Sequence, residues 1–309
     1  MIKFFLKRVL KKVLFFFAIS CGLLQASGHA RRITNFVFSH GFASCKVKAD
    51  AYKQARVIPP TAEQFNYSDA CLSFEASQGY GIALDFWNSC IGQSADVDRL
   101  AHEVNKYDEP VVLFGESRGA ATIINYLASK HATSGRVVAA VLDSPFDRLK
   151  SVLALRLKLL GLQRLLSPES IERLVPYICL KYKPHGAQPI ESIEKINPTI
   201  PLMLIASTQD DIVPHACSIE LYKKLLKQGH ERVYLLLLSQ GKHGWIMQGP
   251  KAKIYRKVVY AFYQKYSIDH GIQDDHEMST SSYDILQDLC KPTLEQLANL
   301  ESITCLETH

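Results

Sequence analysis

Short apolar runs alternate with segments of helical periodicity along this chain. The clearest run is Val111 to Phe114, where four consecutive apolar residues leave no polar side for water, the pattern of a strand buried on both faces. The intervening segments are long enough for crossover helices, so we predict an α/β fold with a doubly wound, mostly parallel sheet. Strands are expected at 34–39, 64–67, 111–114, 136–142, 200–206 and 232–238, and helices at 49–56, 94–107, 217–227 and 252–266.

The N-terminal region does not follow this alternation. Residues 1–30 begin with cations, continue with the apolar run Val13 to Leu24 and end in small residues, as secretory signal peptides do. The run has twelve residues, fewer than the roughly twenty that span a bilayer. We therefore predict a periplasmic or secreted protein, cleaved near Ala26 or Ala30. A lipoprotein lipidated at Cys21, or a signal-anchored protein, is the alternative.

The formal net charge of +6 is unevenly distributed. Residues 31–266 carry +9, whereas residues 267–309 contain nine acids and a single lysine, Lys291. We interpret residues 31–266 as the folded domain and residues 267–309 as an acidic C-terminal tail. A solvated, partly disordered tail is favoured, because acids, Ser and Thr bury little apolar surface. A short docking helix over 292–300 is the alternative. Neither charge nor aromatic spacing suggests nucleic-acid binding.

The chain has eight cysteines, which an exported protein can use for disulfides. Cleavage that removes Cys21 leaves seven, so at least one thiol is unpaired. A disulfide between Cys290 and Cys305 would hold the tail, and a set of buried free thiols is the other interpretation. No cysteine pair has zinc-ligand spacing. We expect neither a metal nor a cofactor.

Gly-Glu-Ser-Arg-Gly at 115–119 lies between the strand at 111–114 and a helical pattern. A serine at such a reversal lies in a strained turn, and small residues two positions before and after it allow the turn to close. The hydroxyl is then presented above the sheet edge at a helix N-terminus, which favours negative charge. The pattern predicts a nucleophile elbow with Ser117 as the nucleophile.

Four motifs resemble the α/β-hydrolase fold superfamily, which includes serine esterases, lipases and peptidases. The resemblance covers roughly residues 33–266, and it is specific because all four motifs occur in the superfamily's order, each at a strand end. The motifs are His-Gly-Phe at 40–42, Gly-Glu-Ser-Arg-Gly at 115–119, Ser-Thr-Gln-Asp-Asp-Ile-Val-Pro at 207–214 and Gly-Lys-His-Gly at 241–244.

A serine nucleophile needs a base, and imidazole has the proton affinity closest to neutral pH. His243 follows the last predicted strand in a loop bracketed by glycines, so we predict it as the base. The imidazole needs an acid to orient it. The resemblance implies Asp210, four residues before the Pro of Asp-x-x-Val-Pro, rather than Asp211. Asp143, at the end of an earlier strand, is the alternative, because some lipases of the superfamily have their acid there.

The resemblance also implies an oxyanion hole formed by the backbone N–H groups of Phe42 and Arg118. His40 is expected to shape the loop that carries Phe42. The side chain of Arg118 is a separate question. We expect it to pair with a local acid such as Glu116 rather than to bind a substrate anion.

An insertion at about 147–189 interrupts the alternation, at the position where superfamily members carry a lid. Its first helix, predicted over 152–166, is apolar nearly all round, which implies two partners. Leu153 and Leu157 on the second face suggest an acyl-binding wall. Packing against a second helix that begins at Ser167 is favoured over contact with a membrane surface. The face expected to pack on the domain consists of Val152, Leu155, Leu159, Leu162 and Leu166.

These features favour an exported serine hydrolase that cleaves carboxylic esters, such as lipid or acyl esters, through an acyl-enzyme. A serine peptidase or amidase of the same fold is the nearest alternative, because the predicted triad does not distinguish an ester from an amide. A non-catalytic binding protein that retains the fold is a second alternative. The expected partner is a small or lipid-like ester.

Overall fold

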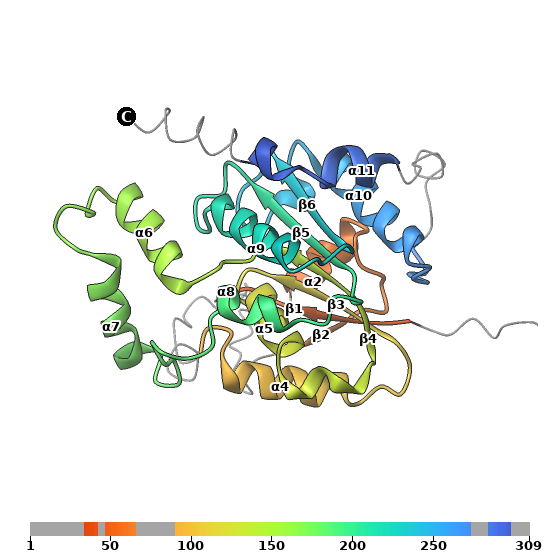
Figure 1. Cartoon of the computed structure of the whole chain (residues 1–309), viewed down its shortest axis with the longest axis horizontal. Helices are drawn as coiled ribbons and strands as arrows, with labels where there is room; N and C mark the ends of the chain where they lie inside the picture. Colours follow the sequence, from red (N-terminus) through yellow and green to blue (C-terminus); the bar gives the residue numbers. More distant parts are fainter. Residues whose placement is uncertain (1–33, 43–46, 66–89, 273–283, 298–309) are drawn as a thin grey trace, which may run out of the picture. The chain divides into compact units, whose positions relative to one another are not determined.

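The computed structural model describes residues 34–42, 47–65, 90–272 and 284–297, which are organised around one sheet (Figure 1). Within these residues, six parallel strands are hydrogen-bonded in the order β2-β1-β3-β4-β5-β6. The predicted doubly wound parallel sheet is confirmed. The strands are β1 (Asn35–Ser39), β2 (Glu63–Phe65), β3 (Val111–Glu116), β4 (Val137–Asp143), β5 (Leu202–Ser207) and β6 (Val233–Leu238).

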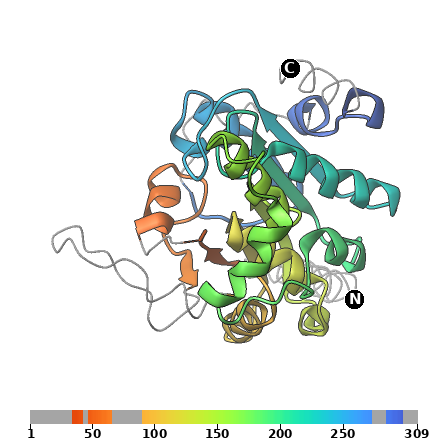
Figure 2. The ribbon, with the colours of Figure 1, turned by 90° about the vertical axis from the view of Figure 1, so that its left-hand side faces the viewer.

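Helices cover both faces of the sheet (Figures 1 and 2). They are α2 (Val47–Gln54), α4 (Ser94–Val104), α5 (Arg118–Leu127), α8 (Pro189–Ser192), α9 (His215–Lys227), α10 (Ala252–Lys265) and α11 (Asp284–Cys290). Successive side chains of a strand point to opposite faces. Phe38 and Phe114 therefore pack with α2, α10 and α11, whereas Val37 and Leu113 pack with α4, α5, α8 and α9. This arrangement leaves the carboxyl ends of the strands at one edge of the sheet.

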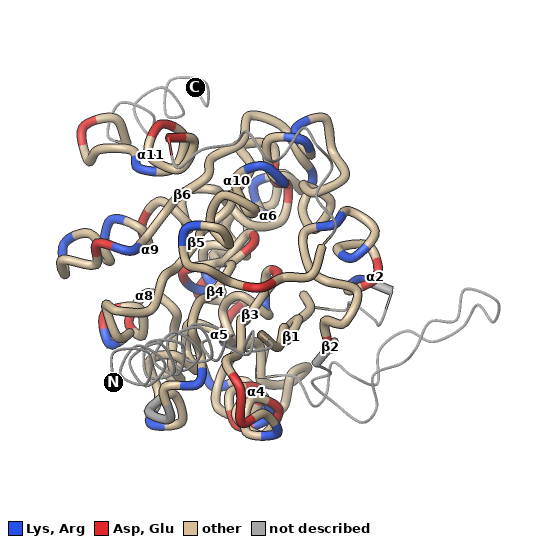
Figure 3. The backbone as a smooth tube through the Cα atoms, turned by 90° about the vertical axis from the view of Figure 1, so that its right-hand side faces the viewer, with Lys and Arg blue, Asp and Glu red and all other residues tan. Residues whose placement is uncertain are grey.

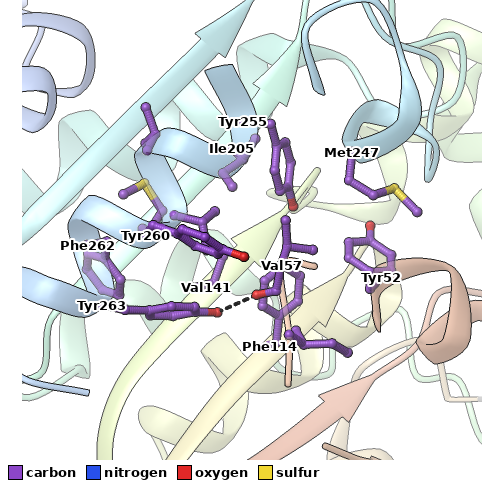
Figure 4. Close-up of a cluster of buried hydrophobic side chains, with 14 of the residues drawn as sticks. Tyr52, Val57, Phe114, Val141, Ile205, Met247, Tyr255, Tyr260, Phe262 and Tyr263 are labelled. Atoms are coloured by element: carbon purple, nitrogen blue, oxygen red, sulfur yellow. Dashed lines mark hydrogen bonds between the residues drawn. The ribbon is translucent and has the colours of Figure 1, made fainter. Parts of the chain in front are cut away.

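Aromatic side chains fill the layer between the sheet and helices α2 and α10 (Figure 4). The Tyr52 ring packs edge-on against Phe114, with the ring centroids 5.2 Å apart. The Tyr263 hydroxyl donates a hydrogen bond to the Val57 carbonyl oxygen at 2.9 Å, so this phenol is buried without losing its partner. The layer supports the ends of β1 and β3, from which the loop at 40–42 and Ser117 extend.

A pair of helices, α6 (Leu149–Leu159) and α7 (Pro168–Ile178), occupies the predicted insertion between β4 and β5 (Figure 1). The second helix begins as predicted. The Ser167 side chain accepts a hydrogen bond from the Ser170 backbone N–H at 3.1 Å, which satisfies a donor that the first turn cannot pair.

The first insertion helix is shorter than predicted. It ends at Leu159, and Gly161 follows with a φ of +68°, a left-handed conformation that terminates many helices. The stripe of leucines expected to continue to Leu166 is therefore never formed on one helix. Leu159 and Leu166, two members of the expected packing face, are exposed.

A different face of α6 packs. Leu149 and Leu153 contact Cys179 and Tyr182 in a small cluster at the end of α7, and Leu157 is buried. Leu153, which was expected to form an acyl-binding wall together with Leu157, packs in this cluster instead. Which face of α6 packs depends on where α6 and α7 end. The apolar pattern alone does not specify these ends.

The C-terminal segment at 284–297 packs on the domain. Leu286 and Cys290 of α11 lie in the cluster that contains α10, whereas Leu297, in a helical turn at 294–297, lies in the cluster on the opposite face of the sheet. This segment therefore passes over β6, an edge strand, and covers a row of backbone groups that would otherwise be open to pairing. The two acids of α11, Asp284 and Asp288, are exposed, and their positions are red on α11 in Figure 3. Residues 284–297 are therefore packed on the domain, and the expectation of a solvated tail for residues 273–283 and 298–309 lies outside the described part.

The described cysteines are all buried free thiols. Burial raises the pKa of Cys290 to about 12, which makes it unreactive at neutral pH. The interpretation as buried thiols is confirmed for these residues, and Cys305, the suggested partner of Cys290, lies outside the described part. The free thiols are Cys90, Cys179, Cys217 and Cys290.

The predicted signal peptide at 1–30 lies outside the described residues. Among the helices that are described, none is long and apolar enough to cross a membrane.

Candidate active site

Ser117 occupies the turn between β3 and α5, as the elbow pattern predicted. Its φ and ψ of 53° and −115° are strained for a residue with a side chain, a conformation that commonly marks functional sites. The turn is close-packed: a Cβ atom on Gly119 would overlap the carbonyl oxygen of Ser39. The N-terminus of α5 therefore rests against the end of β1, and Ser117 lies between the two strand ends.

His243 and Asp210 are hydrogen-bonded to each other. The Nδ1 atom of His243 lies 2.7 Å from Oδ2 of Asp210. The other carboxylate oxygen, Oδ1, accepts backbone N–H groups from Ile212 at 2.9 Å and Val213 at 2.8 Å. Both carboxylate oxygens are occupied, which fixes the orientation of Asp210 and, through it, the imidazole ring. The remaining ring nitrogen, Nε2, is then the one that can exchange a proton.

The surroundings of His243 favour its protonated form. Burial by itself lowers the pKa of the imidazole, but the hydrogen bond and charge of Asp210, together with the charges of Glu116 and Asp143, raise it above its usual value. An imidazole that becomes a more stable cation is a better proton acceptor in a reaction.

The two alternative acids are placed elsewhere. The carboxylate of Asp143 is fully buried and accepts hydrogen bonds from the hydroxyls of Tyr52 at 2.7 Å, Tyr255 at 2.9 Å and Ser144 at 3.0 Å. Asp211 is exposed, and its backbone carbonyl accepts a hydrogen bond from an Arg side chain. Of the three candidates, Asp210 is the one that contacts His243.

The loop at 40–42 lies beside the nucleophile. A Cβ atom on Gly41 would be 3.5 Å from the Cβ of Ser117. The ring nitrogen Nδ1 of His40 is 2.8 Å from the carbonyl oxygen of Gly41, so this buried histidine is part of the loop's own structure, as expected. Phe42 follows Gly41, and Arg118 is the first residue of α5. Gly41 thus lies beside Ser117, and the two predicted oxyanion donors belong to the residues that follow Gly41 and Ser117 in the chain.

The side chain of Arg118 forms a buried ion pair, but with Asp96 instead of Glu116. Its Nε and Nη2 atoms donate to the two Asp96 carboxylate oxygens at 2.8 and 2.7 Å. Asp96 belongs to α4, which packs beside α5, so the pair joins two neighbouring helices. The expected structural role of Arg118 is confirmed and the expected partner is wrong. Sequence spacing gave no sign of Asp96, because the contact links residues that only the fold brings together.

Glu116 takes part in a second buried contact that the sequence did not indicate. Its Oε1 lies 3.8 Å from Nζ of Lys48 on α2, and Nζ also sits 4.1 Å from the centre of the Trp245 ring. Burial raises the pKa of Glu116 to about 7, against the lowering effect of the Lys48 charge. The Gly41 backbone N–H also donates to this carboxylate. Glu116 therefore links the loop at 40–42, through Lys48, to the segment that carries His243.

Gly244, which follows His243, packs closely against Glu116. Gly244 has a φ of +68°, and a Cβ atom there would overlap Oε1 of Glu116 and press on Nζ of Lys48. The residue before the nucleophile and the residue after the predicted base are therefore in direct proximity. Together, a hydroxyl on a strained turn, an imidazole held by a carboxylate and nearby backbone donors are the groups that nucleophilic acyl transfer requires.

Comparison with known proteins covers both the sequence and the fold. The model of the Prolyl oligopeptidase family matches residues 179–269, the region that contains Asp210 and His243. No curated protein matches the sequence significantly.

Several solved structures share the fold. An esterase from Pyrococcus furiosus is 17% identical with a TM-score of 0.50, over 76% of this chain and 84% of that one. Est1E from Butyrivibrio proteoclasticus, with ferulic acid bound, is 14% identical with a TM-score of 0.50, over 79% and 93%. The acylaminoacyl peptidase of Pyrococcus horikoshii is 15% identical with a TM-score of 0.50, over 81% and 39%. The sheet topology and these structural similarities show that the chain has the α/β-hydrolase fold.

Proposed function

We propose that this protein is a serine hydrolase that cleaves carboxylic esters through an acyl-enzyme. The observation that carries the proposal is the 2.7 Å contact between His243 and Asp210 at the sheet edge where Ser117 is held in a strained turn. A serine, a base and an orienting acid in this relation form the catalytic triad of nucleophilic hydrolases.

In the proposed reaction, the Ser117 hydroxyl attacks the ester carbonyl carbon while Nε2 of His243 takes its proton. Asp210 stabilises the resulting imidazolium. The tetrahedral intermediate then expels the alcohol, which receives the proton from His243, and leaves an acyl group on Ser117. A water molecule, activated by the same imidazole, attacks the acyl-enzyme, releases the carboxylic acid and restores the serine.

The negative oxygen of the tetrahedral intermediate needs fixed donors. The backbone N–H groups of Phe42 and Arg118 are our candidates, supported by the position of Gly41 beside Ser117 and of Arg118 at the start of α5. Each such donor typically contributes about 3 kcal/mol to transition-state stabilisation. Because these donors belong to the backbone, side-chain substitutions at the two positions test packing rather than the donors themselves.

A serine peptidase or amidase is the second candidate, and the match to the Prolyl oligopeptidase family favours it. An ester is the less demanding substrate for the same residues, since its alkoxide leaves more readily than an amine, which must be protonated first. The chain covers 84% of the similar esterase but 39% of the similar acylaminoacyl peptidase. A non-catalytic binding protein is the third candidate, and the retention of all three triad positions disfavours it.

Export and a lid role for the insertion complete the proposal. The leader pattern at 1–30 supports export to the periplasm or the medium, with a lipoprotein or signal-anchored form as the alternative. The insertion follows β4 at the sheet edge that carries Ser117. Its Arg156 donates a hydrogen bond to the backbone carbonyl of Asp211 at 3.2 Å, next to the predicted catalytic acid. Movement of α6 would therefore act on the loop that holds Asp210.

Labelling with a fluorophosphonate probe tests the proposal. We expect covalent labelling of Ser117, located by peptide mapping, and no labelling of Ser117→Ala. Matched ester and amide substrates with the same acyl group then compare the first two candidates, and we expect the ester to be cleaved faster. Absence of labelling in folded protein would reject a serine hydrolase and favour the binding protein. The intact mass of exported protein gives the mature N-terminus.

A further inference from the structure

The helical insertion exposes apolar side chains to an unusual extent. Eight of the fourteen large apolar side chains that are exposed in the described residues lie between α6 and the residues just after α7. No residue of α7 is buried, and Leu165 and Tyr177 are 79% and 74% exposed. Mutual packing of the two helices therefore does not account for their leucine content. The exposed leucines, which we call the insertion surface, are Leu159, Leu160, Leu165, Leu166, Leu174 and Leu180.

Exposed cations accompany these leucines. Each leucine or leucine pair of the insertion surface has an exposed Lys or Arg next to it in the sequence, and residues 147–189 carry eight cations and three acids. Of the acids, Glu169 forms an ion pair with Lys150, and Glu172 accepts a hydrogen bond from a tyrosine hydroxyl. No salt bridge to a described residue neutralises the four neighbouring cations, which are Lys158, Arg164, Arg173 and Lys181.

Leucines next to unpaired Lys and Arg side chains fit an anionic bilayer better than a protein partner or a second copy of this chain. The core of a protein interface is depleted in charged residues, whereas each of these leucines or leucine pairs has a cation next to it in the sequence. A second copy of this insertion would bring two surfaces of the same positive charge together. The surface of an anionic bilayer offers both an apolar layer for leucine side chains and negative headgroups for the cations.

We propose that the insertion surface docks on an anionic phospholipid bilayer. The hairpin of α6 and α7 stands at the edge of the sheet where the strands end, in front of the sheet in Figure 2. Docking there places the edge that carries Ser117 toward the bilayer. The inference does not rest on the proposed hydrolysis, because partition into a bilayer needs no chemistry.

Fluorescence quenching by brominated lipids tests the proposal at a single site once the two native tryptophans are replaced by Trp87→Phe and Trp245→Phe. Tyr177→Trp places an indole on the exposed side of α7, and Leu289→Trp places one on α11 as a control at another exposed apolar position. Both are made in the full chain with Ser117→Ala, so that lipids stay intact. With vesicles of phosphatidylcholine and phosphatidylglycerol, we expect quenching at position 177 and none at position 289. The leader is the same in both variants, so the difference reports on the insertion.

Partition measurements provide the second arm. We expect Leu165→Glu combined with Tyr177→Glu to weaken partition into these vesicles by at least about tenfold. The matched pair Leu289→Glu and Leu294→Glu should leave partition unchanged. Equal quenching in vesicles of phosphatidylcholine alone would overturn the anionic requirement. No quenching at position 177 in vesicle-bound protein would overturn docking altogether. Self-association that Leu165→Glu abolishes, without quenching, would assign the surface to a second copy.

Discussion

The carboxyl edge of the sheet buries charged side chains, whereas the insertion beside it exposes apolar ones. At the sheet edge, Asp210, Asp143 and Arg118 are buried, and each is held by two or more hydrogen bonds or ion-pair contacts. In the insertion, few apolar side chains are buried and most of the cations have no partner among the described residues. The sheet edge holds its polar side chains in fixed positions, as catalysis requires. The insertion instead exposes leucines and cations, as a binding surface does.

The two regions therefore depend on the fold in different ways, the candidate site through exact atomic positions and the insertion through exposed area and charge. The site relies on positions fixed to a fraction of an ångström, so that one altered hydrogen bond changes the reaction. The insertion relies on exposed area and charge, to which many side chains contribute a little each. We therefore expect large effects from single substitutions at the sheet edge and small ones on the insertion surface.

The largest expected effect is on catalysis at Asp210. Asp210→Asn removes the charge that holds His243 in the productive tautomer, and we expect kcat for an ester substrate to fall about 10⁴-fold. Asp211→Asn, one residue away and exposed, is the matched control and should retain wild-type activity. Asp143→Asn should lower stability, because Asp143 accepts three hydroxyl hydrogen bonds, but the folded fraction should keep most of its kcat. A greater loss of kcat in Asp143→Asn than in Asp210→Asn would reassign the acid.

The next effect is on stability, through Glu116. Burial raises the pKa of Glu116 from 4.5 to about 7, so the folded protein binds more protons than the unfolded chain across this range. By linkage, the free energy of unfolding falls as pH rises from about 4.5 to about 7, and the contribution of Glu116 is about 3 kcal/mol. We expect Glu116→Gln to flatten this part of the pH profile in urea unfolding. Glu191→Gln, at an exposed position, should leave the profile unchanged. An unaltered slope in Glu116→Gln would show that another group titrates there.

The smallest effects are expected in the insertion, and they divide it into a packed and an open part. Leu149→Ala removes a side chain from the cluster with Cys179 and Tyr182 and should lower the free energy of unfolding by about 2 kcal/mol. Leu165→Ala, at a position 79% exposed, should change it by less than about 0.5 kcal/mol. Urea unfolding of both variants checks this order, and a large loss for Leu165→Ala would mean that the insertion surface is covered within the protein.

Much of the site could be predicted from the sequence, because its chemistry is local to strand ends. Ser117 was identifiable from the glycines around it and the buried strand before it, and His243 from a glycine-bracketed loop after the last strand. Asp210 was preferred over Asp143 by resemblance, and the contact with His243 supports that choice. The partners of Arg118 and Glu116 were not predictable. Asp96 and Lys48 belong to helices that pack near the site only in the folded chain.

The tail and the insertion show where composition misleads. Acids between residues 267 and 309 suggested a solvated tail, but Leu286, Cys290 and Leu297 of the segment at 284–297 are buried against the domain. Leucines on α6 suggested a continuous packing face, but the helix ends at Leu159. In both cases a few contacts, or one chain reversal, outweigh the average character of the segment.

The pattern of apolar runs and turn residues was sufficient to predict the parallel α/β sheet and to single out Ser117 and His243 as candidates, because these signals act locally and recur at every strand end. The folded structure was needed to show which acid contacts the imidazole, which carboxylate is buried beside Lys48 and which leucines remain exposed. These outcomes depend on which elements become neighbours, because a side chain is buried or paired by residues from other segments of the chain.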